Sequence, residues 1–490
     1  MAQELVQKPH IASGIRFVHV DMAYRPYKLT QPYTYALYLE QYLGEVRNRL
    51  DTFEFAQEFN GSPQDLAQVR KHWRCLKVAQ QSLKFPFRVP TRLLEKNPEK
   101  NPDLNKEEAE LVNEFRQLIL RCHAEYCEKQ KEQRLLLSTN SFSNALAAAI
   151  SNFPQATTLC LTDEYSSVSD SIRGHMKDAK KFVSKDGIGA LLRHVNHPIP
   201  WTEIHERDHG MLELVPDLLA AKMLWELPIA IHKAAPGHLQ NLNIKCFPPG
   251  NELITGDFGD FSLSDLQDLR SVGQNLKTLA FDCTHYGYSN PESRMDEKWL
   301  TEAAESVVDS YLGSLLSGGL NSPGKMEHVV LDGRVFLGEL SCWNPGGLFK
   351  YILAGAEDST HVDQRECATA WKSRLETWSM QNFYIEQKTM EGFAAWMLKT
   401  RRASNSLKEA KFGSIILDDG RTDFTSGYDP EKVSWEKAVR ILDQVSQFPD
   451  CVVEMEQFMG GKYRWIRIDM MDGDAMDSES SSGDEMELDE

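Results

Sequence analysis

The sequence has no long hydrophobic run, and this absence argues against a membrane protein. Its apolar stretches, such as 145–150, are far shorter than the roughly 20 residues that a helix needs to cross a bilayer. The first ten residues include Glu4 and lack the apolar core of a secretory signal. We therefore expect a cytoplasmic or nuclear protein that has no membrane partner.

The chain also lacks any Cys-x-x-Cys pair among its nine cysteines. Scattered single cysteines are typical of a reducing compartment, where thiols stay free. Cys122 and Cys127 are five residues apart on an expected helix, so they do not share a face well enough to bind a metal together. The cysteines therefore predict neither disulfides nor a metal cofactor.

The body of the chain is mildly acidic and lacks the basic stripe with interleaved aromatic residues that is typical of a nucleic-acid surface. The formal net charge is −18, of which ten acidic residues in 468–490 account for −10 and leave −8 for the rest. Binding to a phosphate backbone would lack its main electrostatic attraction, so we expect no nucleic-acid partner. The segment 469–490 is acidic and rich in Ser and Gly, which predicts a disordered acidic tail.

The most informative feature present is a short apolar phrase that occurs six times. An apolar residue is followed by a second three positions later and by a third two positions after that. The six copies are Ala156, Leu159, Leu161; Leu239, Leu242, Ile244; Leu276, Leu279, Phe281; Met326, Val329, Leu331; Leu375, Trp378, Met380; and Leu407, Ala410, Phe412. The last two positions of each copy alternate as in a half-buried strand, which makes Trp378 a core residue rather than a ligand-stacking one.

Helical patterns separate the copies, so the expected fold class is α/β. The predicted helices before the strands cover 143–152, 216–227, 262–271, 302–316, 364–372 and 390–400. The third apolar positions are 32 to 83 residues apart, which predicts irregular repeats. A strand and helix unit cannot bury its apolar face alone, so stacked units are expected to form a solenoid over 135–468.

The N-terminal region, 1–134, is expected to contain a strand followed by helices. The strand is predicted at 15–20, and the helices at 33–59, 63–83 and from Asn105 to Arg134. Asn105 with Glu108 three positions later is typical of a capping box that begins a helix. A loop containing prolines is predicted near 86–104.

The phrases at Leu239, Leu276 and Met326 resemble the L-x-x-L-x-L core of leucine-rich repeats. The segment 406–442 and the run 8–18 are similar to parts of fungal F-box proteins with such repeats. The resemblance implies an irregular leucine-rich-repeat-like solenoid that acts as a non-enzymatic protein-protein interaction module, like the substrate-binding part of an F-box protein. It also implies a ubiquitin ligase adaptor recruited by a Skp-type adaptor, although no F-box is expected before Ala12.

Side chains that alternate with the apolar positions are predicted to point away from the core and to bind a protein partner or substrate. These twelve residues are Thr158, Cys160, Asn241, Asn243, Thr278, Asp282, His328, Asp332, Thr377, Ser379, Glu409 and Lys411.

One motif favours an enzyme instead. His205, Glu206 and His209 form an H-E-x-x-H sequence, in which two histidines on a helix bind zinc and the glutamate acts as general base. Pro198 and Pro200 precede the motif and Gly210 follows it, which disfavours a helix there. A zinc-dependent hydrolase is therefore an alternative hypothesis, and a scaffold unrelated to ubiquitin ligation is another.

Overall fold

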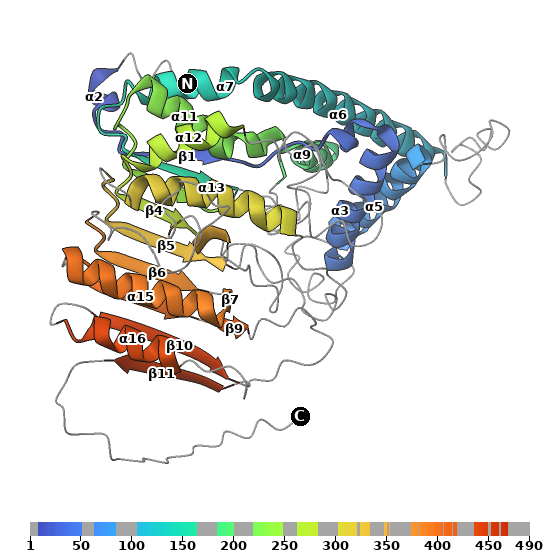
Figure 1. Ribbon diagram of the computed structural model, residues 1–490. Coiled ribbons are helices and arrows are strands. Elements are labelled where there is room, and N and C mark those ends of the chain that lie inside the picture. Colours follow the sequence, from blue (N-terminus) through green and yellow to red (C-terminus); the bar gives the residue numbers. More distant parts are fainter. Residues whose placement is uncertain are drawn as a thin grey trace.

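A computed structural model describes most of the chain as a parallel sheet with helices (Figure 1). The residues that it describes are 8–50, 63–84, 105–163, 184–199, 219–247, 262–282, 302–320, 324–333, 347–349, 352, 374–381, 383–404, 406–413, 415–418, 436–448, 452–459 and 462–468. The predicted loop near 86–104, the helix at 364–372, the H-E-x-x-H motif at 205–209 and the acidic tail at 469–490 lie outside these residues.

The strands of the main sheet follow one another across the sheet in the order of the chain. All neighbouring strands are parallel except the last two, which form an antiparallel hairpin. The nine strands are β1 (Phe17–Asp21), β2 (Thr158–Thr162), β3 (Asn241–Ile244), β4 (Thr278–Phe281), β5 (His328–Asp332), β6 (Thr377–Gln381), β8 (Glu409–Gly413), β10 (Val452–Met459) and β11 (Lys462–Ile468). Two further strands, β7 (Tyr384–Glu386) and β9 (Ile416–Asp418), pair with each other.

The register of the sheet confirms the six apolar phrases. Equivalent positions of neighbouring phrases pair directly, as Leu159 does with Leu242 and as Trp378 does with Ala410. The eighteen apolar residues of the phrases are all buried. The spacing of the three apolar residues within each phrase therefore matches the register between strands that are far apart in the sequence.

Helices connect successive strands and pack on one another. Contacts join α7 to α11, α11 to α12, α12 to α13, and α15 to α16. The helices are α2 (Pro9–Ala12), α3 (Pro32–Leu50), α5 (Pro63–Lys84), α6 (Lys106–Ser138), α7 (Ser141–Ile150), α9 (Lys185–Val195), α11 (Met223–Ala234), α12 (Leu263–Gly273), α13 (Glu302–Leu320), α15 (Gln387–Ser404) and α16 (Glu436–Ser446), with short 3-10 helices η1 (Tyr27–Thr30) and η7 (Leu219–Lys222). The helix predicted at 216–227 begins later, because α11 starts at Met223 and continues through Pro228.

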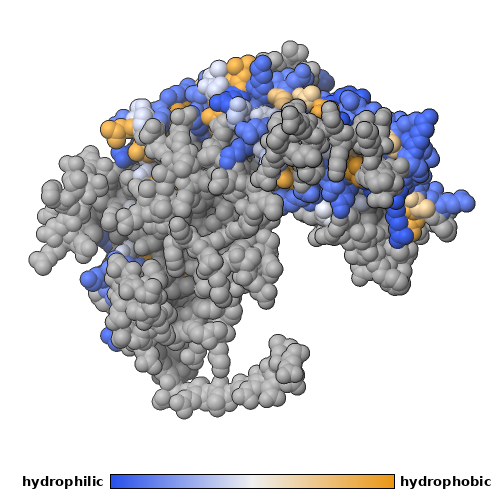
Figure 2. All heavy atoms as spheres, turned by 90° about the vertical axis from the view of Figure 1, so that its right-hand side faces the viewer, coloured by the Kyte–Doolittle hydropathy of each residue, from blue (hydrophilic) through white to orange (hydrophobic). Residues whose placement is uncertain are grey.

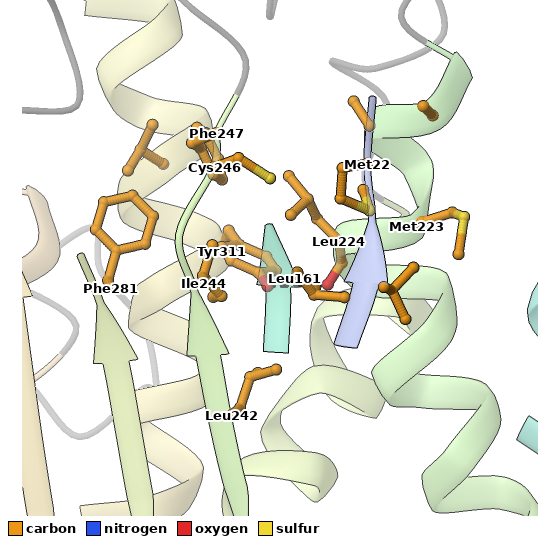
Figure 3. Close-up of a cluster of buried hydrophobic side chains, with 14 of the residues drawn as sticks. Met22, Leu161, Met223, Leu224, Leu242, Ile244, Cys246, Phe247, Phe281 and Tyr311 are labelled. Atoms are coloured by element: carbon orange, nitrogen blue, oxygen red, sulfur yellow. Dashed lines mark hydrogen bonds between the residues drawn. The ribbon is translucent and has the colours of Figure 1, made fainter. Parts of the chain in front are cut away.

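One hydrophobic core extends from Val20 to Val453 between the sheet and the helices. Figure 3 shows part of it, where Leu161 and Phe281 from the sheet lie near Leu224 and Tyr311 from the helices. The buried Tyr311 hydroxyl donates a hydrogen bond to the Leu224 carbonyl oxygen over 2.9 Å, so this polar group is satisfied inside the apolar layer.

The N-terminal region shares the sheet and the core with the rest of the chain. Strand β1 pairs with β2 along its whole length, and α6 continues through residue 134, where the sequence suggested a boundary. The β10–β11 hairpin at the other end of the sheet was not predicted. The strands of the main sheet therefore come from both predicted regions, 1–134 and 135–468.

One side of the described surface is mainly polar. Figure 2, which shows the right-hand side of Figure 1, has hydrophilic side chains over most of its coloured area and scattered hydrophobic ones. Within the part of the chain that the structure describes, no helix combines the length and the apolar character that a membrane span requires.

Candidate functional site

The candidate site is the side of the main sheet that faces away from the apolar core. Because side chains alternate along a strand, residues between the core positions lie on this opposite side. The register aligns them in two rows across the strands, which we call the polar face. The first row contains Phe17, Thr158, Asn241, Thr278, His328, Thr377 and Glu409, and the second contains His19, Cys160, Asn243, Ala280, Val330, Ser379 and Lys411.

Nine of the twelve predicted binding residues are partly exposed, as a contact surface requires. They are Asn241, Asn243, Thr278, Asp282, His328, Thr377, Ser379, Glu409 and Lys411. Ten of the twelve belong to the two rows, whereas Asp282 and Asp332 lie two residues beyond the second row, Asp282 directly after the end of β4. The sheet therefore brings together residues that are up to 253 positions apart in the chain.

The expected exposure is wrong for Thr158, Cys160 and Asp332, which are 8%, 3% and 3% exposed. Strand β2 is buried on both sides, so alternation alone does not make its second side accessible. The Asn241 side chain covers Thr158 and donates a 3.0 Å hydrogen bond from Nδ2 to Oγ1. These three residues thus support the polar face but offer little surface to a partner.

Several side chains of the polar face contact one another, either between strands or along one strand. His328 Nδ1 and Thr377 Oγ1 are 3.0 Å apart, which is hydrogen-bonding distance between β5 and β6. Lys411 and Glu409 form an ion pair of 2.8 Å on β8. These contacts restrict the side chains of the face before binding. Less side-chain conformational entropy is then lost when a partner binds.

Other polar side chains of the same face have no such contact. Within the described parts of the chain, Asn243, Thr278 and Ser379 make no side-chain hydrogen bond. An amide and two hydroxyl groups offer both donors and acceptors to a ligand. The centre of the face is therefore uncharged and able to form hydrogen bonds.

Charged residues line one border of the face, directly before the strands. Backbone hydrogen bonds connect Lys277, Glu327, Glu376 and Lys408 in succession, with N to O distances of 2.7 to 2.8 Å. The Lys408 Nζ also lies 3.0 Å from a Glu376 carboxylate oxygen. A partner that lies across the uncharged centre would meet both signs of charge at this border.

The sequence did not predict the residues that β1 adds to the polar face, Phe17 and His19. Ile15, Val18 and Val20 have the same spacing as the six apolar phrases, so the signal for a seventh copy was present. The sequence-based choice also omitted Ala280 and Val330, which are apolar but partly exposed in the second row. The face is therefore wider and less uniformly polar than predicted.

The described residues include a thiol beside an imidazole in α6, where Cys127 Sγ lies 3.5 Å from His123 Nε2. Within them, no group of three or more His, Cys, Asp or Glu side chains could hold a metal ion. Burial raises the pKa of the Cys122 thiol to about 11 and also raises that of Cys127. Both thiols are thus mainly protonated at neutral pH, which makes them poor nucleophiles.

Comparison with known proteins provides no assignment. No protein-family model, no curated protein and no solved structure matches the chain. The functional argument therefore depends on the residues of the polar face themselves.

Proposed function

We propose that the chain is an irregular leucine-rich-repeat-like solenoid whose polar face binds a protein partner, without catalysing a reaction. The observation that carries the proposal is the alignment of half-exposed, uncharged polar side chains across successive parallel strands. Such a surface is built from many segments of the chain and supports extended binding. Asn243, Thr278 and Ser379 are the residues that we expect to contact the partner.

The uncharged centre favours a protein ligand over a nucleic acid. A phosphate backbone is held mainly by Lys and Arg, and in the two rows of the face Lys411 is the only such residue and pairs with Glu409. Interfaces between proteins tolerate many neutral hydrogen bonds and polar rims. Recruitment by a Skp-type adaptor stays a prediction of the sequence resemblance.

The proposal can be tested by placing positive charge on the polar face. The triple variant Asn243→Lys, Thr278→Lys, Ser379→Lys adds three charges without removing a side-chain hydrogen bond of the described structure. The matched control, Asn113→Lys, Gln117→Lys, Gln267→Lys, adds the same charge at exposed positions of α6 and α12. Both variants should be checked for thermal unfolding midpoints close to that of the parent protein.

The readout is quantitative cross-linking and mass spectrometry of partners captured by the parent protein and by the two variants. We expect at least one partner cross-linked near the face to be reduced about tenfold by the face variant and to be retained by the control. Retention by both variants, or equal loss from both, would contradict binding at this face.

A further inference from the structure

Strand β1 forms one edge of the nine-stranded sheet. It pairs with β2 on one side, and within the described residues no strand pairs with its other side. An unpaired strand edge presents backbone N–H and C=O groups that can join another strand. The side chains of Phe17 and His19 belong to the polar face, whereas pairing at this edge would use the backbone groups of β1.

The hydrogen bonds of β1 identify the backbone groups that point outward. The Met22 N–H donates to the Thr162 carbonyl oxygen of β2 over 2.7 Å. Because backbone direction alternates along a strand, Val18 and Val20 also point their N–H and C=O groups toward β2. The corresponding groups of Phe17, His19 and Asp21 therefore point to the open edge.

The side chains of β1 leave this edge accessible. Phe17 is 63% exposed, and His19 and Asp21 are also exposed. On the core side, Val18 is only partly buried although it packs against the hydrophobic core. Val18 therefore keeps some exposed apolar surface, which a further strand beside β1 would cover.

The two ends of the sheet differ. Strand β11 at the other edge is the second strand of an antiparallel hairpin, whereas β1 pairs in parallel with β2. Basic residues on an edge strand commonly prevent pairing with other chains. Strand β1 contains no Lys, Arg or Pro, so it lacks this protection.

We propose that β1 binds an extended segment of a partner protein as an added strand. The segment would be uncharged in its centre and would have apolar side chains at alternate positions, one of which would cover Val18. Its opposite side would lie beside Phe17. This mode of recognition obtains affinity from main-chain hydrogen bonds and specificity from alternate side chains.

A synthetic peptide tests the proposal without a known partner. The probe is fluorescently labelled Lys-Thr-Val-Thr-Val-Thr-Val-Lys, together with two versions that are N-methylated at alternate amides. Only one set of amides can face β1, so we expect one version to bind about tenfold more weakly and the other to bind like the unmodified peptide. Hydrogen exchange of residues 15–22 should slow when the unmodified peptide binds.

Two substitutions in the protein provide an independent test. His19→Pro removes an N–H from the open edge and leaves the β2 ladder intact, because proline is tolerated where the strand N–H faces outward. We expect it to weaken peptide binding about tenfold, whereas His19→Ala should retain binding. Val20→Pro removes a hydrogen bond to β2 together with a buried side chain and should lower the unfolding midpoint.

Three results would overturn the proposal. They are absence of peptide binding, equal binding of the two N-methylated peptides, and unchanged binding by His19→Pro. A concentration-dependent dimer in sedimentation that His19→Pro abolishes would assign the edge to a second copy of this chain instead. The charge variants of the polar face leave β1 unaltered, so failure at the edge and failure at the face can be distinguished.

Discussion

Gly273 in α12 lies directly against the backbone carbonyl of Leu315 in α13, with no space for a Cβ atom between them. Gly318 of α13 meets the Arg270 carbonyl of α12 in the same way. Two small residues thus allow the backbones of neighbouring helices to touch. The strands that follow these two helices in the chain, β4 after α12 and β5 after α13, pair in the sheet, so the helix spacing and the strand spacing depend on each other.

Gly273→Ala is expected to destabilise the protein. The added methyl group would overlap a backbone atom that cannot move without separating α12 from α13, and overpacking of this kind costs about 1–3 kcal/mol. Chemical denaturation should therefore show a lower free energy of unfolding. Gly44→Ala in α3 is the control, because nothing lies within 4 Å of the new Cβ and the helix propensity of alanine should stabilise the protein slightly. Equal effects of the two substitutions would contradict the close helix contact.

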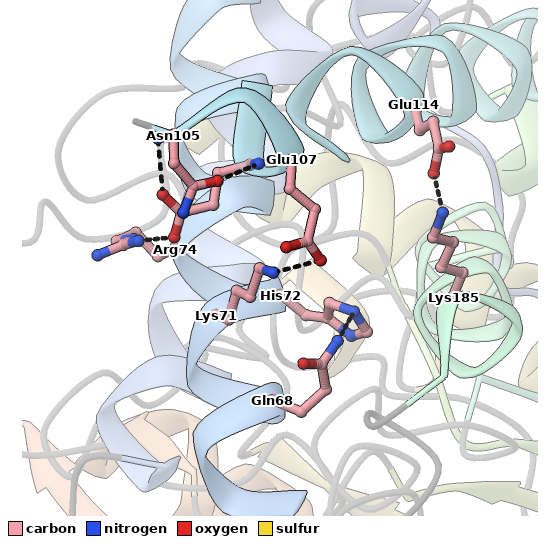
Figure 4. Close-up of polar contacts among 9 residues, drawn as sticks. Gln68, Lys71, His72, Arg74, Asn105, Glu107, Glu114 and Lys185 are labelled. Atoms are coloured by element: carbon pink, nitrogen blue, oxygen red, sulfur yellow. Dashed lines mark hydrogen bonds and ion pairs between the residues drawn. The ribbon is translucent and has the colours of Figure 1, made fainter. Parts of the chain in front are cut away.

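Asn105→Ala is expected to remove the N-terminal cap of α6. The Glu108 N–H donates to Asn105 Oδ1 over 2.9 Å, and the Asn105 N–H donates to Glu108 Oε2 over 3.2 Å (Figure 4). Loss of such a cap costs about 1 kcal/mol. Thermal unfolding should show a lower midpoint for Asn105→Ala than for Asn113→Ala, which removes an exposed asparagine from the same helix. A midpoint equal to that of the parent protein would show that α6 does not depend on this cap.

Stability should also depend on the protonation of Glu226. Burial raises the pKa of this carboxyl group in α11, although Lys222 and a 3.4 Å hydrogen bond from Ser143 Oγ oppose the shift. The pKa of Glu226 is higher in the folded than in the unfolded state, so protonation of this carboxyl group stabilises the fold. This contribution to the free energy of unfolding is complete below the unfolded pKa of about 4.3 and is lost as the pH rises through the folded pKa.

Glu226→Gln should therefore raise the unfolding midpoint at pH 7 and change it little at pH 4. The amide has nearly the same shape and can still accept the Ser143 hydrogen bond, so the substitution removes the buried charge alone. Glu110→Gln, at an exposed position of α6, is the control and should show no comparable difference between the two pH values. An unchanged midpoint at pH 7 would show that the Glu226 charge is well solvated.

The sequence predicted the strands well because their core positions are set locally. Leu159 and Leu161, for example, have the same spacing as their partners Leu242 and Ile244, and this spacing is enough to align β2 with β3. The capping box at Asn105 was predicted for the same reason, since a cap involves only four consecutive residues. Both features depend on neighbours in the sequence.

Features that depend on distant residues were not predicted. Cys160 is buried although its row neighbours, His19 and Asn243, are exposed and partly exposed, and these neighbours are 141 positions earlier and 83 positions later in the sequence. The contact of Gly273 with Leu315 likewise forms only when the helices pack. The alternation of side chains along each strand therefore predicted which side of the sheet a residue lies on. It did not predict how exposed that residue is.

Trp378→Ala is expected to be among the most destabilising substitutions in the sheet. The indole ring is fully buried, with its centroid 5.1 Å from that of Phe393 and 6.3 Å from that of Trp396 in α15. The neighbouring position on β8 is Ala410, whose small side chain leaves room for the ring. Removal of a buried aromatic side chain costs about 3–5 kcal/mol. Trp378→Phe should cost less in the same denaturation experiment, and an equally small loss for both variants would contradict the core position.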